Sequence, residues 1–348
     1  MPKLPRIDQD FLLKTLIRLL EIPSPTGYTE AVIDQLKDHM KVLGLDSEIT
    51  PKGTLIATWK GEQDIRPRAL TAHVDTLGAM VKEIKTNGRL KLTQIGGYAW
   101  NSIEGEGCTV LKADGDLRGS ILLTKASGHV HGEAVGKTER NENTLEVRLD
   151  DRTDSKDETL ALGVQVGDFV ALDARVEAGS AGFIRSRHLD DKAGVAAVLG
   201  AIHALKTAGL IPKQSTTFHF STYEEVGHGA AAGFPEQLQE LVAVDMAAVG
   251  EGQASDEFHV TICVKDKGGP YHHALSQQLR RLAETHAIPY KVDIYPFYGS
   301  DGEAYWRAGG DVRVALIGPG VDASHNYERT HIEAVVASTK LICAYLLS

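Results

Sequence analysis

Five short motifs bearing acidic or imidazole side chains follow strand-like apolar runs in this 348-residue chain, and this arrangement constrains the fold more than any other feature. Strand-like runs at residues 54–58, 69–74, 216–221 and 241–244 alternate with helical patterns. Such alternation predicts an α/β fold with a mostly parallel mixed sheet covered by helices on both faces. In open sheets of this kind, ligands bind at the carboxyl ends of the strands.

The helical patterns have the apolar spacing of packed helices. Residues 11–20 place apolar side chains on one face and contain Lys14 and Arg18, which favours an amphipathic helix over a signal peptide. Further helices are expected at residues 28–43, 193–205, 271–287 and 332–347. No apolar run approaches the ~20 residues that span a bilayer, so we expect a cytoplasmic protein.

A long segment of different character interrupts the α/β pattern. Residues 76–181 are rich in glycine and short β-like runs and have no long helical period. Asn87-Gly88 lies between two apolar runs, which is a strong hairpin signal. We therefore expect a small all-β domain at residues 76–181, inserted into a larger domain formed by residues 1–75 and 182–348.

Composition excludes several classes of protein. A hydrophobic fraction of 42% and a charged fraction of 24% are typical of a globular chain. The net charge of −10 makes nucleic acid or an anionic membrane a poor partner through bulk charge. Three cysteines far apart, with no CxxC pair, favour a reducing compartment and argue against a disulfide framework or a zinc finger.

The order of the motifs along the chain indicates a function that no single motif indicates. In chain order they are Ala72-His73-Val74-Asp75, Asp190-Asp191, Glu224-Glu225, Val244-Asp245 and Ser324-His325. Viewed singly, each has an ordinary explanation, such as a helix cap or a solvated loop. Together they supply two imidazoles and at least three carboxylates, which suits two divalent metals sharing one carboxylate. Mixed nitrogen and oxygen ligands favour zinc, with cobalt or manganese as alternatives.

Some histidines stay outside this set. His129 and His131 form a second His-x-His pair, but they lie in the insert without acids in a matching context, so we exclude them. His228 lies near the Glu-Glu motif in the sequence, and its role is left open. Adjacent glutamates can divide two roles, because a general base must reach the proton it removes while staying off the metal.

The ordered set resembles the co-catalytic metallopeptidases of clan MH. Within this clan the chain resembles the TET-type aminopeptidases, the family also labelled glutamyl aminopeptidase or endoglucanase-like. The resemblance runs from Ile22-Pro23-Ser24-Pro25-Thr26-Gly27 to His325. It includes the place of the β insert between the His-x-Asp and Asp-Asp motifs, whereas carboxypeptidase-like relatives carry their dimerisation domain later.

This resemblance implies a dinuclear metal-dependent aminopeptidase that hydrolyses N-terminal residues from short peptides with a metal-activated water. It assigns as metal ligands His73, Asp190, Glu225, Asp245 and His325. Asp190 would be the bridge, joined by His73 and Asp245 in one site and by Glu225 and His325 in the other.

Two further residues receive roles from the resemblance. Asp75 would orient His73, and Glu224 would take a proton from the attacking water and deliver it to the leaving amine. The β insert would form a homodimer, and dimers of this family build homododecamers. Two alternatives stay open at this point: a metal-dependent deacylase or amidohydrolase acting on a small acylated or modified dipeptide, and a non-catalytic oligomeric binding scaffold.

The chain departs from the family pattern around the ligands. Lys192 replaces an arginine, His228-Gly229-Ala230 replaces leucine-arginine-glycine, and Ala323-Ser324 replaces an arginine-tyrosine pair. These departures resemble a subgroup linked to N-acetylglutaminylglutamine amide osmoprotectant systems. Gly299-Ser300-Asp301-Gly302 matches a family segment that lines the substrate pocket, and a simple turn explains it equally well.

Overall fold

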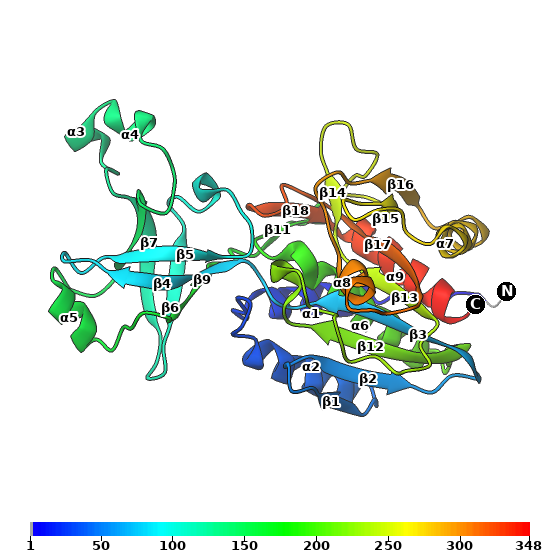
Figure 1. Ribbon diagram of the computed structural model, residues 1–348. Coiled ribbons are helices and arrows are strands. Elements are labelled where there is room, and N and C mark those ends of the chain that lie inside the picture. The colour runs from blue at the N-terminus through cyan, green and yellow to red at the C-terminus, as the bar shows by residue number, and fades with distance from the viewer. Residues whose placement is uncertain (1–2) are drawn as a thin grey trace.

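The computed structural model describes residues 3–348 and has two bodies, a large α/β domain and a small β-barrel that projects from it (Figure 1). The larger body is built on a 12-stranded mixed sheet, and the smaller one is a closed barrel of six strands. The expected fold class, an α/β domain with an inserted all-β domain, is confirmed. No helix within residues 3–348 combines the length and the apolar character needed to cross a membrane.

Four parallel strands form the centre of the large sheet. In spatial order they are β12 (Gln214–Ser221), β3 (Gln63–His73), β13 (Glu240–Val244) and β17 (Arg313–Asp322). Shorter strands extend the sheet: β1 (Ser47–Ile49), β2 (Leu55–Trp59), β10 (Glu177–Ala178), β11 (Phe183–Ser186), β14 (Ala247–Val249), β15 (Val260–Lys265), β16 (Tyr290–Ile294) and β18 (Glu328–His331). The central runs are buried on both faces, as the continuous apolar residues of β13 and of the first half of β17 predict.

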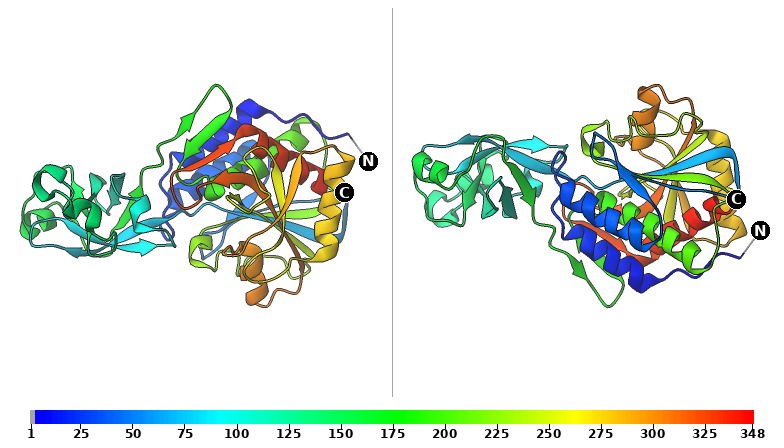
Figure 2. Two further views of the ribbon diagram at one scale, coloured as in Figure 1. Left: turned by 90° about the horizontal axis from the view of Figure 1, so that it is seen from above. Right: turned by 90° about the horizontal axis from the view of Figure 1, so that it is seen from below.

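Helices cover both faces of this sheet. The first face packs against α2 (Glu30–Val42), α6 (Leu189–Thr207) and α9 (Ile332–Leu346), and α1 (Gln9–Leu20) packs on α6 and α9. These four helices lie together on one side of the sheet in Figure 2. Next to α9, α7 (His273–Thr285) packs against β15 and β17 and adds to the same core. On the opposite face, α8 (Asp301–Arg307) packs against β3, β13 and β17. Successive residues of β13 point to opposite faces of the sheet. Val242 packs in the core on the face covered by α6 and α9, and Leu241 packs in the core on the face covered by α8.

Close packing explains the small residues of α6. Almost every residue of this helix is buried between the sheet and α1 and α9. A Cβ atom at Gly200 would lie 2.2 Å from Cδ2 of Leu12, so only glycine lets α1 approach this closely. The alanine-rich sequence therefore reflects a helix that is buried all round.

The inserted barrel has its own hydrophobic core. Its strands are β4 (Gly78–Ile84), β5 (Leu90–Ile95), β6 (Gly107–Leu111), β7 (Leu117–Leu123), β8 (Leu145–Leu149) and β9 (Phe169–Leu172). The predicted Asn87-Gly88 hairpin joins β4 to β5, with Gly88 at φ +76°. Because β10 already pairs within the large sheet, the chain re-enters the larger body between Leu172 and Glu177.

Short helical turns complete the structure. They are η1 (Trp100–Ser102), α3 (Gly128–His131), α4 (Ala134–Lys137), α5 (Lys156–Ala161) and η2 (Glu224–Val226). The first four belong to the insert, and η2 follows β12 in the larger body.

A buried carboxylate ties the strands together at the end of the sheet opposite the motifs. Glu240 is 1% exposed and lies beside Arg68 and Arg313 in the register of three neighbouring strands. Its oxygens lie 3.0 Å from Arg68 Nε and 3.0 Å from Arg313 Nη2. The Arg68 contact is an ion pair, and Arg68 Nε makes no hydrogen bond among the described residues. The hydroxyl of Tyr345, on α9, donates to Glu240 at 2.9 Å.

Replacing this carboxylate should destabilise the large domain without disturbing the motif edge. Glu240→Gln leaves two arginines without their anion, so we expect a loss of about 3 kcal/mol in unfolding free energy. Tyr345→Phe removes one hydrogen bond and should cost about 1 kcal/mol. Urea unfolding followed by the fluorescence of Trp59 and Trp306 measures both. Equal losses in the two variants would show that the ion pairs contribute nothing beyond the hydrogen bond.

Candidate metal centre

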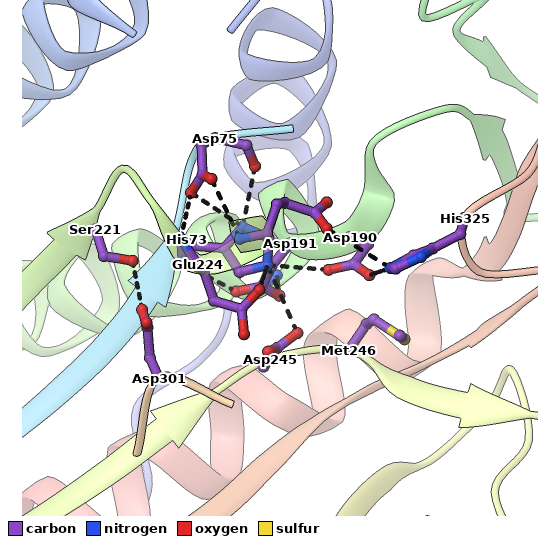
Figure 3. Close-up of polar contacts among 12 residues, drawn as sticks. His73, Asp75, Asp190, Asp191, Ser221, Glu224, Asp245, Met246, Asp301 and His325 are labelled. Carbon is purple, nitrogen blue, oxygen red and sulfur yellow. Dashed lines mark hydrogen bonds and ion pairs between the residues drawn. The ribbon is translucent and has the colours of Figure 1, made fainter. Parts of the chain in front are cut away.

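The five predicted ligands converge at one edge of the sheet. Figure 3 labels His73, Asp190, Asp245 and His325 among them. His73 ends β3, and Asp245 directly follows β13. Asp190 lies at the start of α6, and Glu225 lies in η2, just after β12. His325 lies in the loop between β17 and β18. The parallel centre of the sheet explains the convergence, since the carboxyl ends of its strands meet at a single edge.

The ligand atoms form two groups that share Asp190. One group is His73, Asp190 and Asp245, and the other is Asp190, Glu225 and His325; in each group the atoms lie within 4.8 Å of one another. Asp190 uses a different oxygen toward each histidine: Oδ1 lies 3.0 Å from His73 Nε2, and Oδ2 lies 3.3 Å from His325 Nε2. This is the arrangement expected of a bridging carboxylate.

The chemistry of this donor set fits divalent cations. Burial raises the pKa of Asp245 to about 7, and the neighbouring charge of Asp190 adds to the effect. Burial likewise raises the pKa of Glu225 well above its ordinary value, again with a contribution from Asp190. Within residues 3–348, Asp245 Oδ1 is buried without a hydrogen-bond partner. A buried oxygen without a hydrogen-bond partner costs free energy, and so does the repulsion among neighbouring carboxylates. Coordination of a metal by these carboxylates would remove both costs.

Asp75 supports the centre in two ways. The ring nitrogen Nδ1 of His73 lies 3.0 Å from the backbone carbonyl of Asp75 and 3.6 Å from its carboxylate. Because a carbonyl only accepts, Nδ1 carries the proton and Nε2 is left to face Asp190. The Asp75 carboxylate accepts from the backbone N–H groups of Glu224 (3.1 Å) and Glu225 (3.3 Å). Asp75 therefore positions the Glu-Glu motif as well as the histidine.

Glu224 lies beside both groups and belongs to neither. Its Oε2 is 3.8 Å from His73 Nε2, and its side chain is 16% exposed. Burial raises the pKa of Glu224 well above its ordinary value, and the charges of Asp245 and Asp301 raise it further. Cations bound next to it would lower that pKa. A carboxylate at the mouth of the site, free of the ligand groups, can accept a proton from a water molecule.

The Gly299-Ser300-Asp301-Gly302 segment has two separate functions in the structure. Gly299 lines the cavity over the ligands, and Ser300 is the N-cap residue of α8. Asp301 is buried and accepts from Ser221 Oγ and from the backbone N–H of Ala230 at 2.8 Å. It therefore holds both ends of the turn that contains Glu224.

Three histidines and a lysine that were singled out in the sequence belong to neither ligand group. His228 is exposed and stacks on Tyr223, with ring centroids 5.2 Å apart. His129 and His131 are exposed on α3. Lys192 is fully buried, which lowers its pKa to about 7, and its Nζ donates to the carbonyl of Ile22 at 2.7 Å. This departure from the family pattern therefore concerns internal packing.

A cavity of about 370 Å³ opens over the ligands. Three residues that line this cavity were not predicted from the motifs: Met246, Phe297 and Tyr298. Met246 directly follows the predicted ligand Asp245, and Phe297 and Tyr298 directly precede Gly299. Their positions next to motifs are the sequence signal that could have identified them. A larger cavity of about 880 Å³ lies beside the start of α1, but the described residues that line it include none of the predicted ligands.

Comparisons with known proteins agree with this geometry. The family model described as M42 glutamyl aminopeptidase matches residues 53–341. The YhfE protein of Bacillus subtilis strain 168 is 49% identical over 337 residues, which cover 97% of each chain. The lysyl aminopeptidase of Pyrococcus furiosus is 23% identical and covers 80% of each chain.

A solved structure extends the likeness to the whole fold. The TET1 peptidase of Pyrococcus horikoshii, whose description states that it assembles into a tetrahedron or a large octahedral shell, superposes with a TM-score of 0.85. It is 23% identical, with 97% of this chain and 99% of that chain covered. The likeness in sequence and fold, with the motif residues gathered at one edge of the sheet, shows that the chain belongs to the M42 family of aminopeptidases.

Proposed function

We propose that this aminopeptidase is a dinuclear metalloenzyme that releases N-terminal residues from short peptides. The observation that carries the proposal is the double contact of Asp190, whose two oxygens face His73 and His325 in two ligand groups. Zinc is the proposed metal, with cobalt or manganese as alternatives, because the ligands mix imidazole and carboxylate.

The residues divide the chemistry among them. When bound, two divalent cations would polarise the scissile carbonyl and lower the pKa of the attacking water. Glu224 takes the proton from that water and passes it to the leaving amine, and the Asp75 carboxylate holds the Glu224 backbone in place.

Chelation should abolish hydrolysis, and metal should restore it. Dialysis against a chelator is expected to remove about two metals per chain and all release of free N-terminal residues. Zinc, cobalt and manganese are then added back separately, with metal content measured by elemental analysis. Hydrolysis that persists in metal-free protein would contradict the proposal, and so would protein that takes up no metal on re-addition.

The two adjacent glutamates give a matched pair of variants. Glu224→Gln removes the base and should lower kcat by about 10²- to 10⁴-fold while both metals stay bound. Glu225→Gln removes a ligand and should leave about one tightly bound metal. Steady-state kinetics together with metal analysis separate the two effects. Wild-type kcat in Glu224→Gln would exclude the assigned base.

The cavity favours a neutral, apolar N-terminal residue. Its described lining contains no lysine or arginine to pair with a glutamyl side chain. Its four carboxylates, Asp190, Glu224, Glu225 and Asp245, are all assigned to metal binding or proton transfer, which leaves none for a lysyl side chain. The other large side chains, Met246, Phe297 and Tyr298, offer apolar contact.

Leucyl and methionyl substrates should therefore exceed glutamyl and lysyl substrates by at least about tenfold in kcat/KM, because an unpaired charge is costly to bury. Phe297 is 94% exposed, so Phe297→Ser should not affect folding and should lower kcat/KM more for leucyl than for alanyl anilide. N-acetylated dipeptides serve as the control. Cleavage of these blocked compounds in place of free ones would favour the deacylase alternative.

Assembly and location complete the proposal. We infer a homo-oligomer whose subunits meet through the barrel insert, in line with the large shells described for the Pyrococcus horikoshii relative. Dimer and dodecamer are both compatible with this inference, and light scattering distinguishes them. A cytoplasmic location and the link to osmoprotectant systems stay predictions.

A further inference from the structure

Glu328, at the start of β18, contacts the backbones of two predicted ligands that are far apart in the sequence. It is 2% exposed and belongs to neither ligand group. Its Oε1 accepts from the backbone N–H of His325 at 3.0 Å, and its Oε2 accepts from the backbone N–H of Asp190 at 3.1 Å. One carboxylate thus links the start of α6 to the loop between β17 and β18.

The His325 loop needs such a support. His325 has φ +64° and Ala323 has φ +57°, a region that L residues rarely adopt. Ala323 and Asn326 are exposed, so burial of side chains does little to fix the loop. A strained backbone persists only where its surroundings determine it, and the bond from Glu328 acts on the backbone of the ligand itself.

The surroundings of Glu328 strengthen this link. The Arg187 side chain is 2% exposed, and its Nη1 lies 3.3 Å from the carbonyl of Asn326. Its Nη2 donates to the carbonyl of Ser102 in the insert. Gly97, also in the insert, accepts from His325 Nδ1 through its carbonyl. The ring of His325 is therefore oriented from the insert, while its backbone is held by Glu328.

The carboxylate has a function separate from the strand that carries it. β18 pairs with β11 through backbone contacts that any side chain at position 328 would allow. The two oxygens of Glu328 instead serve the ligand backbones. A glutamine of the same size offers only one oxygen, and its amide would place a donor against the second N–H group.

We propose that Glu328 is a positioning residue for the second metal site, the one formed by Asp190, Glu225 and His325. This inference rests on the proposed dinuclear function. Asp190 belongs to both sites and His325 only to the second, so losing the link should weaken the second site selectively. The first site keeps His73 and Asp245, neither of which contacts Glu328.

Cobalt titration of metal-free protein tests this independently of catalysis. Visible absorption and calorimetry are recorded for the wild type, Glu328→Gln and Glu328→Asp. The matched control is Glu333→Gln, whose side chain is exposed in the first turn of α9. In Glu328→Gln we expect the first cobalt affinity within about threefold of wild type and the second weakened about 10- to 100-fold. Glu328→Asp keeps both acceptors and should recover part of the second affinity, and Glu333→Gln should match the wild type.

Each other outcome contradicts a defined part of the argument. Unchanged affinity for both cobalt ions in Glu328→Gln would overturn the positioning role. Equal weakening of both sites together with a lower melting temperature would show that Glu328 has only a structural role. If Glu328→Gln does not fold, the cobalt affinities of Glu328→Asp test the positioning role instead. Wild-type protein that binds no cobalt would overturn the dinuclear function and this inference together. Two bound cobalt ions without peptide hydrolysis would overturn only the proposed activity.

Discussion

Repulsion among buried carboxylates is the constraint on which this site depends. Asp190, Glu225 and Asp245 meet within a few ångströms of two histidines, at a place where burial alone disfavours their charged forms. A fold gains no stability from such a cluster unless cations or donors compensate it. The nearby backbone N–H groups of Glu224 and Asp190 donate to the carboxylates of Asp75 and Glu328, so they do not neutralise the ligand carboxylates. Bound cations would supply the missing compensation.

The same constraint shapes the rest of the large domain. Four parallel strands bring the ligands to one edge, and helices on both faces keep this arrangement rigid. The opposite end of the sheet is held by Glu240 and its two arginines, an ion network that lies away from the ligands. The buried carboxylate at that end has cationic partners within the protein, whereas the carboxylates at the motif edge repel one another.

Strand ends could be recognised from the sequence, and with them the residues that gather at the sheet edge. Each motif followed an apolar run, and parallel packing places such positions together. The Asn87-Gly88 hairpin was equally accessible, because its turn chemistry is local. Contacts made by backbone atoms could not be predicted from the motifs. The carbonyl of Gly97, the N–H groups that bind Glu328 and the two-fold use of Asp75 depend on where loops cross in space. The apolar walls of the cavity come from loops for the same reason.

The path of the chain between the two bodies has a consequence for how the barrel can move. The chain leaves the large domain directly after Asp75, which contacts His73, and it returns between Leu172 and Glu177. The carbonyl of Leu172 lies 3.4 Å from the ring of His188, two residues before Asp190, so both crossings lie near the candidate metal centre. The loop at Pro25 pairs with Thr76 at the first crossing, and Gly97 reaches back to His325. A tilt of the barrel would therefore move residues next to the predicted ligands at three places, the two crossings and the contact between Gly97 and His325. A partner bound to the insert would therefore act on residues that contact the predicted ligands, because Gly97 of the insert contacts the ring of His325.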